Sequence, residues 1–258
     1  MSNFFTKQLE DASKGSVFFS AIRKARRIEI ERKKKEARWQ DYKIYPSSLK
    51  SMTQCPKEFI KSLEKAGTIE DLQAVYRVKR GSAVHREFQD SLLLSDKLYQ
   101  KPKYIEDERI RAKLEANWPE VPYHSKITNH SGSADGMIKF KNRPAVIELK
   151  TTSVDDYKWE ALDKPSDAHI FQVMDYMYHF NEMEYFDIKI EESFLCYLQL
   201  RYDPGEQDAE KEFTVYYDEH KEKYLSYIHE ETRQLRAYID KVELKCNHEF
   251  CFRHRERK

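Results

Sequence analysis

Apolar and polar residues alternate through the middle of the chain, in the stretch GSADGMIKFKNRPAVIELKTTS from Gly132 to Ser153. A period of two is typical of strands, so we expect a hairpin whose strands are joined at residues 141–144. Similar patterns elsewhere complete the set of predicted strands, which lie at 123–128, 133–140, 145–151, 192–201 and 214–217.

Helix-forming residues dominate the segments around these strands. We expect a helix at 1–40 and a short helix that follows a turn at Pro46 and Ser47. Further helices are expected at 72–94, 106–118, 168–180 and 219–241. Helices that precede a strand meander, followed by a helix and a further strand, indicate a mixed α/β domain. No internal repeat or low-complexity linker marks a sharp domain boundary.

The predicted hairpin has two chemically different faces. If residues 141–144 form its loop, Phe140 lies opposite Ala145, and one face carries only apolar side chains besides Gly136. The other face carries Asp135, Met137, Lys139, Val146, Glu148 and Lys150. This register places Asp135 opposite Lys150, with Glu148 one step away on the same face.

The charged face has two explanations. A solvent-exposed hairpin gives the same alternation, stabilised by cross-strand pairs of acids and lysines. Met137 and Val146 indicate instead that this face is partly covered, where paired carboxylates are costly unless something neutralises them. A divalent cation would take Asp135 and Glu148 as oxygen ligands, and Lys150 would hold a water or a phosphate oxygen. This arrangement predicts metal-dependent hydrolysis of a phosphodiester.

Four motifs occur in an order known from one enzyme superfamily. GSAD at 132–135 followed by IELK at 147–150 resembles the signature of the PD-(D/E)XK nucleases. Three other segments resemble the RecB-type branch, which includes CRISPR-associated and phage exonucleases: GSAVH at 81–85, QVMDY at 172–176 and SSLKSMTQCPKEF at 47–59. The resemblance spans residues 45–201.

The resemblance implies a restriction-endonuclease-like core, with a central mixed sheet flanked by helices. A nuclease domain would cover residues 45–258, preceded by a helical, basic extension at 1–44. It also implies the site residues. His85 would join Asp135 and Glu148 as a metal ligand for Mg²⁺ or Mn²⁺, and the catalytic set would be Asp135, Glu148, Lys150, Gln172 and Tyr176.

Several of these residues have ordinary structural alternatives. His85 on a helix is also compatible with a hydrogen-bonded histidine that binds no metal. Gln172 and Tyr176 are four residues apart, so they can contact each other along the helix. Within the resemblance, Gln172 orients the metal site or the substrate and Tyr176 lies near the DNA backbone. We expect His179, on the same stripe, to face solvent or DNA without a catalytic role.

Four cysteines lie far apart in the sequence, which argues against a disulfide framework. Some members of the resembling branch hold an iron–sulfur cluster with one cysteine before the His helix and three near the C-terminus. Cys55, Cys246 and Cys251 match three of those places, and His248 or His254 would be the fourth ligand of an iron–sulfur cluster or zinc. A vestigial site is the alternative. Cys196 alternates with apolar residues and is expected in the core.

Charge is distributed unevenly along the chain. The net charge is +1, but residues 21–39 contain 9 basic and 3 acidic residues. This segment, including Lys33, Lys34 and Lys35, is either a phosphate-binding arm or a solvated helix. No apolar stretch approaches the roughly 20 residues of a membrane helix, and the first residues lack a signal-peptide pattern. We therefore expect an intracellular, cytoplasmic protein, in a bacterial or phage-infected cell if the resemblance holds.

The expected function is a Mg²⁺- or Mn²⁺-dependent DNA exonuclease that processes single- or double-stranded ends for recombination, repair or replication. Partner proteins from those processes are expected, whereas a membrane partner is not. Two alternatives use the same fold. One is a structure-selective or site-specific endonuclease, and the other is a catalytically inactive DNA-binding subunit, from which one of the three motif positions would usually be lost.

Overall fold

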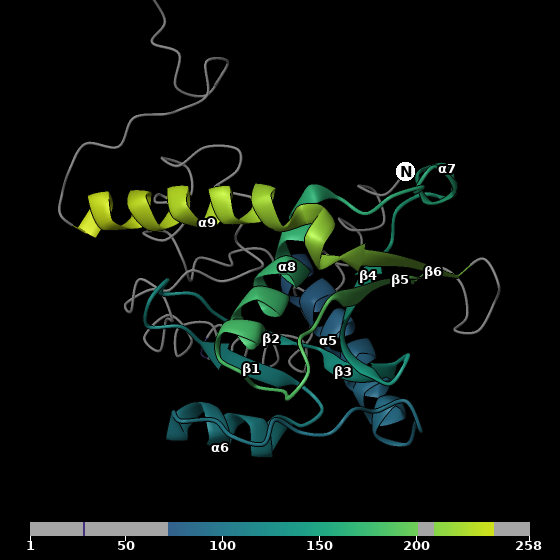
Figure 1. Cartoon of the computed structure of the whole chain (residues 1–258). Helices are drawn as coiled ribbons and strands as arrows, with labels where there is room; N and C mark the ends of the chain where they lie inside the picture. Colours follow the sequence, from purple (N-terminus) through teal and green to yellow (C-terminus); the bar gives the residue numbers. More distant parts are fainter. Residues whose placement is uncertain (1–27, 29–71, 201–208, 240–258) are drawn as a thin grey trace, which may run out of the picture.

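The computed structural model describes residues 72–200 and 209–239, together with Ile28. Figure 1 shows the helices α5 (Leu72–Leu93), α6 (Glu108–Asn117), α7 (Asp156–Glu160), α8 (Asp167–Glu182) and α9 (Tyr217–Ile239). The strands are β1 (Val121–His124), β2 (Ser131–Ala134), β3 (Gly136–Phe140), β4 (Arg143–Thr152), β5 (Glu192–Gln199) and β6 (Glu210–Tyr216). Most predicted elements are present within a few residues of their expected ends, and the short helix α7 was not predicted.

The central sheet has four strands in the order β3-β4-β5-β6. β3 and β6 run antiparallel to their neighbours, whereas β4 and β5 pair in parallel, so the sheet is mixed. α8 supplies the crossover that a parallel pair requires. The predicted mixed α/β fold, with a central mixed sheet flanked by helices, is confirmed.

The hairpin between β3 and β4 turns in two residues instead of four. Lys141 and Asn142 both have positive φ, 47° and 63°, as a two-residue type I′ turn requires, and Phe140 pairs with Arg143. The predicted register was therefore wrong by two residues. A shift of two keeps each side chain on its predicted face. Extended by one position, the observed register places Asp135 beside Glu148 and not beside Lys150.

The strand predicted at 133–140 is divided at Asp135. Residues before it form β2, which pairs with β1 in a separate two-stranded sheet, and residues after it form β3. The next residue is Gly136, and a larger residue would not fit there, because its Cβ atom would lie 2.5 Å from a side-chain carbon of Leu92. Asp135 therefore stands where the two sheets separate and β4 loses its partner.

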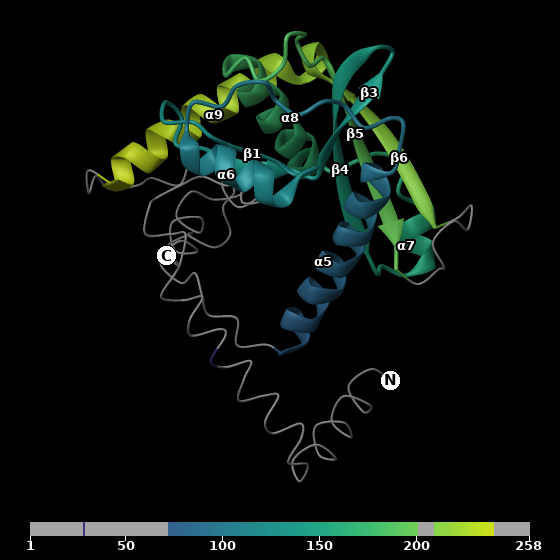
Figure 2. The same cartoon turned by 90° about the horizontal axis from the view of Figure 1, so that it is seen from below.

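Helices cover the two faces of the central sheet with different side chains. α5 packs Leu92 and Phe88 against the face that carries Ala145, Ile147 and Phe194. The opposite face belongs to the main core, where Val146 of β4 and Leu195 of β5 pack with apolar residues of two helices. These are Val173, Met174 and Met177 of α8, and Tyr224 and Ile228 of α9. Figure 2 shows α5 on the other side of the strands from α8 and α9. The face that also carries Glu148 and Lys150 is thus covered by α8, in agreement with the sequence-based expectation from Met137 and Val146.

Several predictions lie outside the described residues. They are the N-terminal helix and extension at 1–44, the domain boundary at 44–45, the motif at 47–59, the basic residues Lys33, Lys34 and Lys35, and Cys55, Cys246, Cys251, His248 and His254. Cys196 is half-buried against the smaller core, as expected. Among the helices within residues 72–200 and 209–239, none is long and apolar enough to cross a bilayer.

Candidate active site

Asp135 connects three elements at the point where the sheets separate. Its Oδ2 accepts a hydrogen bond from the backbone N of Leu149 at 2.8 Å, which fixes the carboxylate against the unpaired edge of β4. Its Oδ1 lies 3.0 Å from Nδ1 of His85 on α5. The side chain is 13% exposed, so solvent still reaches it. Gln89, one helical turn after His85, approaches the backbone O of Asp135 at 3.5 Å.

Gly81 explains how α5 comes this close to β4. A Cβ atom at this position would lie 3.2 Å from Oγ1 of Thr151, which is tighter than an ordinary contact. A larger side chain would therefore move this turn of α5 away from the strand. His85 is four residues later on the same helical face. The close approach that Gly81 allows therefore also brings His85 toward Asp135.

Glu148, Lys150 and Gln172 form a closed polar triangle between β4 and α8. Oε1 of Glu148 accepts from Nζ of Lys150 at 2.8 Å and from Nε2 of Gln172 at 2.7 Å. Oε1 of Gln172 accepts from Nζ of Lys150 at 2.6 Å. Nε2 of Gln172 also donates to the hydroxyl of Tyr176 at 2.8 Å. The contact along α8 that the sequence allowed as a structural alternative is therefore present, and the same amide also reaches the strand.

The second oxygen of Glu148 is different. The side chain is 5% exposed, and Oε2 is buried with no hydrogen-bond partner among the described residues. Burial, and then the charge of Asp135, raise the pKa of Glu148 to about 7, against the opposing effect of Lys150. A buried carboxylate oxygen without a donor is costly and needs an explanation.

The neighbouring groups respond to the same charges. Burial by itself would lower the pKa of His85, but its hydrogen bond to Asp135 and the charges of Asp135 and Glu148 outweigh this effect and raise it. The pKa of Tyr176 is raised well above its ordinary value by burial and by Glu148. Tyr176 is therefore a neutral hydroxyl at physiological pH.

The donor set fits a hard divalent cation. The unmatched Oε2 of Glu148, the 13% exposed Asp135 and His85 provide oxygen and imidazole ligands of the type that Mg²⁺ and Mn²⁺ accept. The 3.0 Å between His85 Nδ1 and Asp135 Oδ1 is also a separation that two neighbouring ligands of one octahedral ion can have, with bonds of about 2.1 Å. Among the described residues, Glu148 does not complete this pair as a group of three ligand atoms within 4.8 Å of one another.

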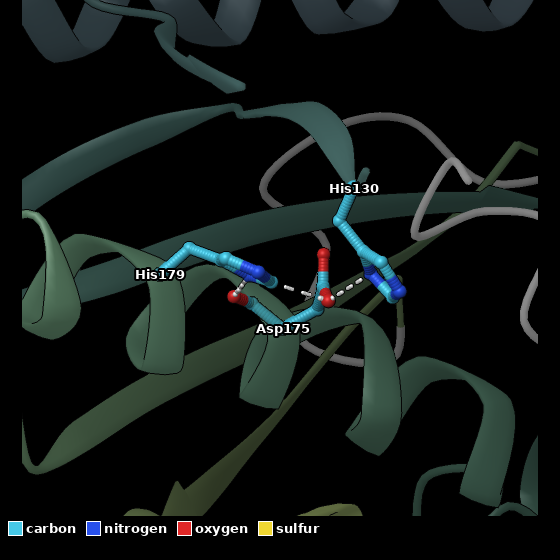
Figure 3. A group of neighbouring side chains, drawn as sticks. All are labelled: His130, Asp175 and His179. Atoms are coloured by element: carbon cyan, nitrogen blue, oxygen red, sulfur yellow. Dashed lines mark hydrogen bonds and ion pairs between the residues drawn. The ribbon is translucent and has the colours of Figure 1, made fainter. Parts of the chain in front are cut away.

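A second cluster of possible ligands is fully buried, and two of its three residues are on α8, the helix that carries Gln172 and Tyr176. Among the described residues, His130, Asp175 and His179 bring three ligand atoms within 4.8 Å of one another. Figure 3 shows the two histidine rings on either side of the Asp175 carboxylate. His130 Nδ1 lies 2.7 Å from Asp175 Oδ1, and His179 Nδ1 lies 2.8 Å from the backbone O of Asp175. All three side chains are at most 1% exposed.

The protein's own groups already serve as partners for Asp175 and His179 in this cluster. The hydroxyls of Tyr123 and Tyr224 also donate to the Asp175 carboxylate, one to each oxygen. His179 uses both ring nitrogens, because its Nε2 lies 2.8 Å from Oγ1 of Thr128. Burial lowers the pKa of His130 well below its usual value and that of His179 to about 4, so both rings are neutral. The cluster is a hydrogen-bonded joint between β1, the start of β2, α8 and α9.

The structure brings six of the predicted site residues into one connected set: His85, Asp135, Glu148, Lys150, Gln172 and Tyr176. The expectation for His179 was wrong, since its side chain is buried against Asp175 and Thr128. Asp175 was not singled out, and its position between Gln172 and Tyr176 in the motif gave no separate signal. Its partners are 45 to 52 residues away in sequence.

Comparisons with known proteins place the fold in context. No protein-family model matches the chain, and no curated protein matches it. The crystal structure of SSO0001 is 16% identical, with a TM-score of 0.43 over 78% of this chain and 77% of that chain. An alkaline exonuclease from Laribacter hongkongensis, LHK-Exo, is 13% identical, with a TM-score of 0.33 over 52% of this chain and 66% of that chain. LHK-Exo in complex with dAMP is 14% identical, with a TM-score of 0.42 over 78% of this chain and 91% of that chain.

Proposed function

We propose that this chain is a divalent-metal-dependent DNA nuclease that acts on strand ends. The observation that carries the proposal is the Glu148 carboxylate. It is held by Lys150 and Gln172 through one oxygen, and its other oxygen is buried with no donor from the described residues, while the charges of Asp135 and His85 act on the same carboxyl group. An ordinary surface hairpin does not account for a carboxylate in this environment.

The residues divide the work of phosphodiester hydrolysis. Asp135, Glu148 and His85 would hold Mg²⁺ or Mn²⁺, which supplies Lewis-acid stabilisation of phosphate charge and a more acidic bound water. Lys150 is 19% exposed, so its ammonium can hold a water or a phosphate oxygen beside Glu148. Gln172 holds the side chains of Lys150 and Glu148 in place by hydrogen bonds to both. The hydroxyl of Tyr176 in turn accepts a hydrogen bond from the Gln172 amide and fixes its orientation.

The choice of an exonuclease over an endonuclease rests on the motif order, which resembles that of the RecB-type exonucleases. His85 and Asp135 also line an open cavity of about 590 Å³ between α5 and the end of α6. The roles in recombination, repair or replication that the motif resemblance implies belong to this proposal as well. So do DNA as the partner and a cytoplasmic location.

Digestion of end-labelled linear DNA and of closed circles, with Mg²⁺ or with excess EDTA, tests the proposal. We expect Mg²⁺-dependent release of short products from linear DNA and no cleavage of circles. Glu148→Gln and Lys150→Ala should each lower the rate by about 100-fold or more while DNA binding persists. Lys139→Ala, which removes an exposed ammonium from β3, is the matched control. Activity in EDTA, or in both site variants, would contradict the assignment, and cut circles would indicate an endonuclease.

A further inference from the structure

A separate cavity lies at the opposite end of α8 from Gln172. It opens between the segment that leads into α6, the turn that joins β1 to β2, and the C-terminal end of α8, and its volume is about 620 Å³. This volume lies within the range of roughly 300–1,000 Å³ that is typical of small-ligand sites. None of the six residues of the candidate active site lines it, so a ligand here would not take part in the proposed nuclease chemistry.

Three tyrosines line this cavity, and packing fixes the rings of two of them. Tyr178 meets the ring of His179 edge to face, with the ring centres 5.0 Å apart. Tyr185 stacks on Phe180 at 5.4 Å and is only 5% exposed. Tyr104 is 70% exposed, so it belongs to the open side of the cavity. The face of an aromatic ring attracts a cation within about 6 Å, so these walls favour a positively charged ligand.

Acidic side chains outnumber basic ones in the lining. Four carboxylates and two cations leave a formal charge of −2, from Glu106, Asp107, Glu108, Glu182, Arg109 and Lys126. The pKa of Asp107 is lowered by the backbone N–H of Arg109 and further by the charge of Lys126, and Glu108 pairs with Arg111 at 3.6 Å. Glu106 and Glu182 have no ion-pair partner among the described residues, so two carboxylates are left for a ligand.

The two remaining carboxylates come from different walls of the cavity. Glu106 precedes α6, two residues after Tyr104, whereas Glu182 is the last residue of α8. The pKa of Tyr178 is raised by burial and by the charge of Glu182, so this carboxylate lies close to the phenol. A ligand with an ammonium group at each end can therefore meet one carboxylate at each end, while its carbon chain lies against the tyrosine rings.

We infer that this cavity binds an organic diammonium ion, with its ammonium groups on Glu106 and Glu182 and its carbon chain against the tyrosines. An anion is repelled by the net negative lining. A metal ion needs converging ligand atoms, and among the described residues these acids form no group of three within 4.8 Å of one another. The inference uses no residue of the candidate active site, so it stands apart from the nuclease proposal.

Isothermal titration calorimetry on the full-length protein, without DNA and at constant ionic strength, tests the site. Diaminobutane and diaminohexane, with an amine at each end, are the probes. Butylamine and hexylamine are the matched ligands, because each has the same carbon chain and lacks one ammonium group. We expect saturable binding of one diamine per chain, and binding of the corresponding monoamine that is about 10-fold weaker, since one charge-assisted contact is lost.

Variants of the lining locate the bound diamine. Glu106 and Glu182 are exposed, so their replacement leaves the core intact, and Glu106→Gln and Glu182→Gln should each weaken binding about 10-fold. Tyr178→Leu should weaken it several-fold, whereas Tyr178→Phe keeps the aromatic face and should retain most of the affinity. Glu219→Gln on α9 and Tyr157→Leu on α7 remove an exposed acid and an exposed ring outside the cavity, so these controls should bind like the wild type.

The possible outcomes separate this site from general attraction to an acidic surface. Equal diamine affinity in the lining variants and in their controls would overturn the inference, and so would equal affinity for a diamine and its monoamine. Heat that never saturates would reject it as well. Loss of diamine binding in Glu182→Gln, with binding retained in Glu219→Gln and in Tyr178→Phe, would support the site whether or not the chain cleaves DNA.

Discussion

Glu148 and Asp175 are both buried carboxylates in contact with α8, and their surroundings differ in one respect. Asp175 receives donors on both oxygens from Tyr123, Tyr224 and His130, so the folded chain completes its coordination. Glu148 receives two donors on one oxygen and none from the described residues on the other. The first environment is that of a structural joint. The second is incomplete without something from outside the chain, which is why it is the better candidate for chemistry.

The geometric proximity of ligand atoms alone would have chosen the other cluster. His130, Asp175 and His179 form the tighter three-residue group, yet both oxygens of Asp175 and both ring nitrogens of His179 already have protein partners, and all three side chains are buried. A metal there would have to displace the hydrogen bonds of His130 and His179 to Asp175. His179 also lines a cavity of about 620 Å³, so access does not separate the two sites. The comparison teaches that an unmatched carboxylate oxygen is a better sign of function than close packing of ligand residues.

The largest expected difference between the two carboxylates concerns stability. Asp175→Ala leaves two tyrosine hydroxyls and a histidine without their common acceptor, so it should lower the free energy of unfolding by about 3–5 kcal/mol. Glu148→Gln should change it by less than about 1 kcal/mol near pH 5, because the amide keeps the size of the carboxyl group. Urea unfolding of both variants measures the contrast. Similar losses in both would show that Glu148 is also mainly structural.

A second difference follows from pH. Burial, with the charge of Asp135, raises the pKa of Glu148 from 4.5 to about 7 in the folded protein. As pH rises through this window the unfolded chain loses the proton first, so the contribution of Glu148 to stability is complete below pH 4.5 and is lost by about pH 7. In EDTA, Glu148→Gln should therefore become more stable than the wild type as pH rises, by up to roughly 3 kcal/mol. A difference that does not vary between pH 4.5 and pH 8 would contradict this environment for Glu148.

Divalent ions should distinguish the two centres directly. Mg²⁺ at 100 times its dissociation constant stabilises a folded protein by about 2.7 kcal/mol, which raises the melting temperature by several degrees in a chain of this size. We expect this increase in the wild type and in Asp175→Asn, whose starting stability is lower, but not in Glu148→Gln. The reverse result, with the increase lost only in Asp175→Asn, would move the metal to the His130 and His179 cluster.

The smallest effect is expected at Gly81. Alanine favours the helix by up to about 1 kcal/mol relative to glycine, but its Cβ would lie 3.2 Å from Oγ1 of Thr151. Gly81→Ala should therefore leave stability nearly unchanged while activity falls several-fold, because α5 carries His85 away from Asp135. The double variant Gly81→Ala with Thr151→Ser should show the same activity loss, as it keeps the oxygen, whereas Thr151→Ala should relieve it. Unchanged activity in Gly81→Ala would show that this close approach does not position His85.

Local sequence patterns predicted much of this molecule because they depend on neighbouring residues. Alternation located the strands and separated the apolar face of Ile147 and Leu149 from the face of Glu148 and Lys150. The spacing of Gln172 and Tyr176 predicted their contact on one helical face. The motif order also selected residues that lie together in space, although their chemical roles stay predictions.

Contacts between distant segments were beyond such patterns. The loop was predicted with four residues, but the positive φ angles of Lys141 and Asn142 give a two-residue turn and bring Asp135 level with Glu148. The break at Asp135, where one expected strand joins two sheets, depends on packing against α5 and β1. His179 was expected to face solvent or DNA. Its burial could not be read from the local pattern, because its partner Thr128 is 51 residues away in sequence.

The sequence by itself determined the type and approximate ends of most described elements and the two faces of the hairpin between β3 and β4. It also proposed a set of metal ligands, whose role stays a prediction. The tertiary structure decided which of the carboxylates is satisfied and which is not. That difference depends on donors delivered from other elements, by Tyr123 and Tyr224 to Asp175 and by Gln172 to Glu148. Hydrogen bonding is directional and short-ranged, so it is settled only when the chain has folded and those groups meet.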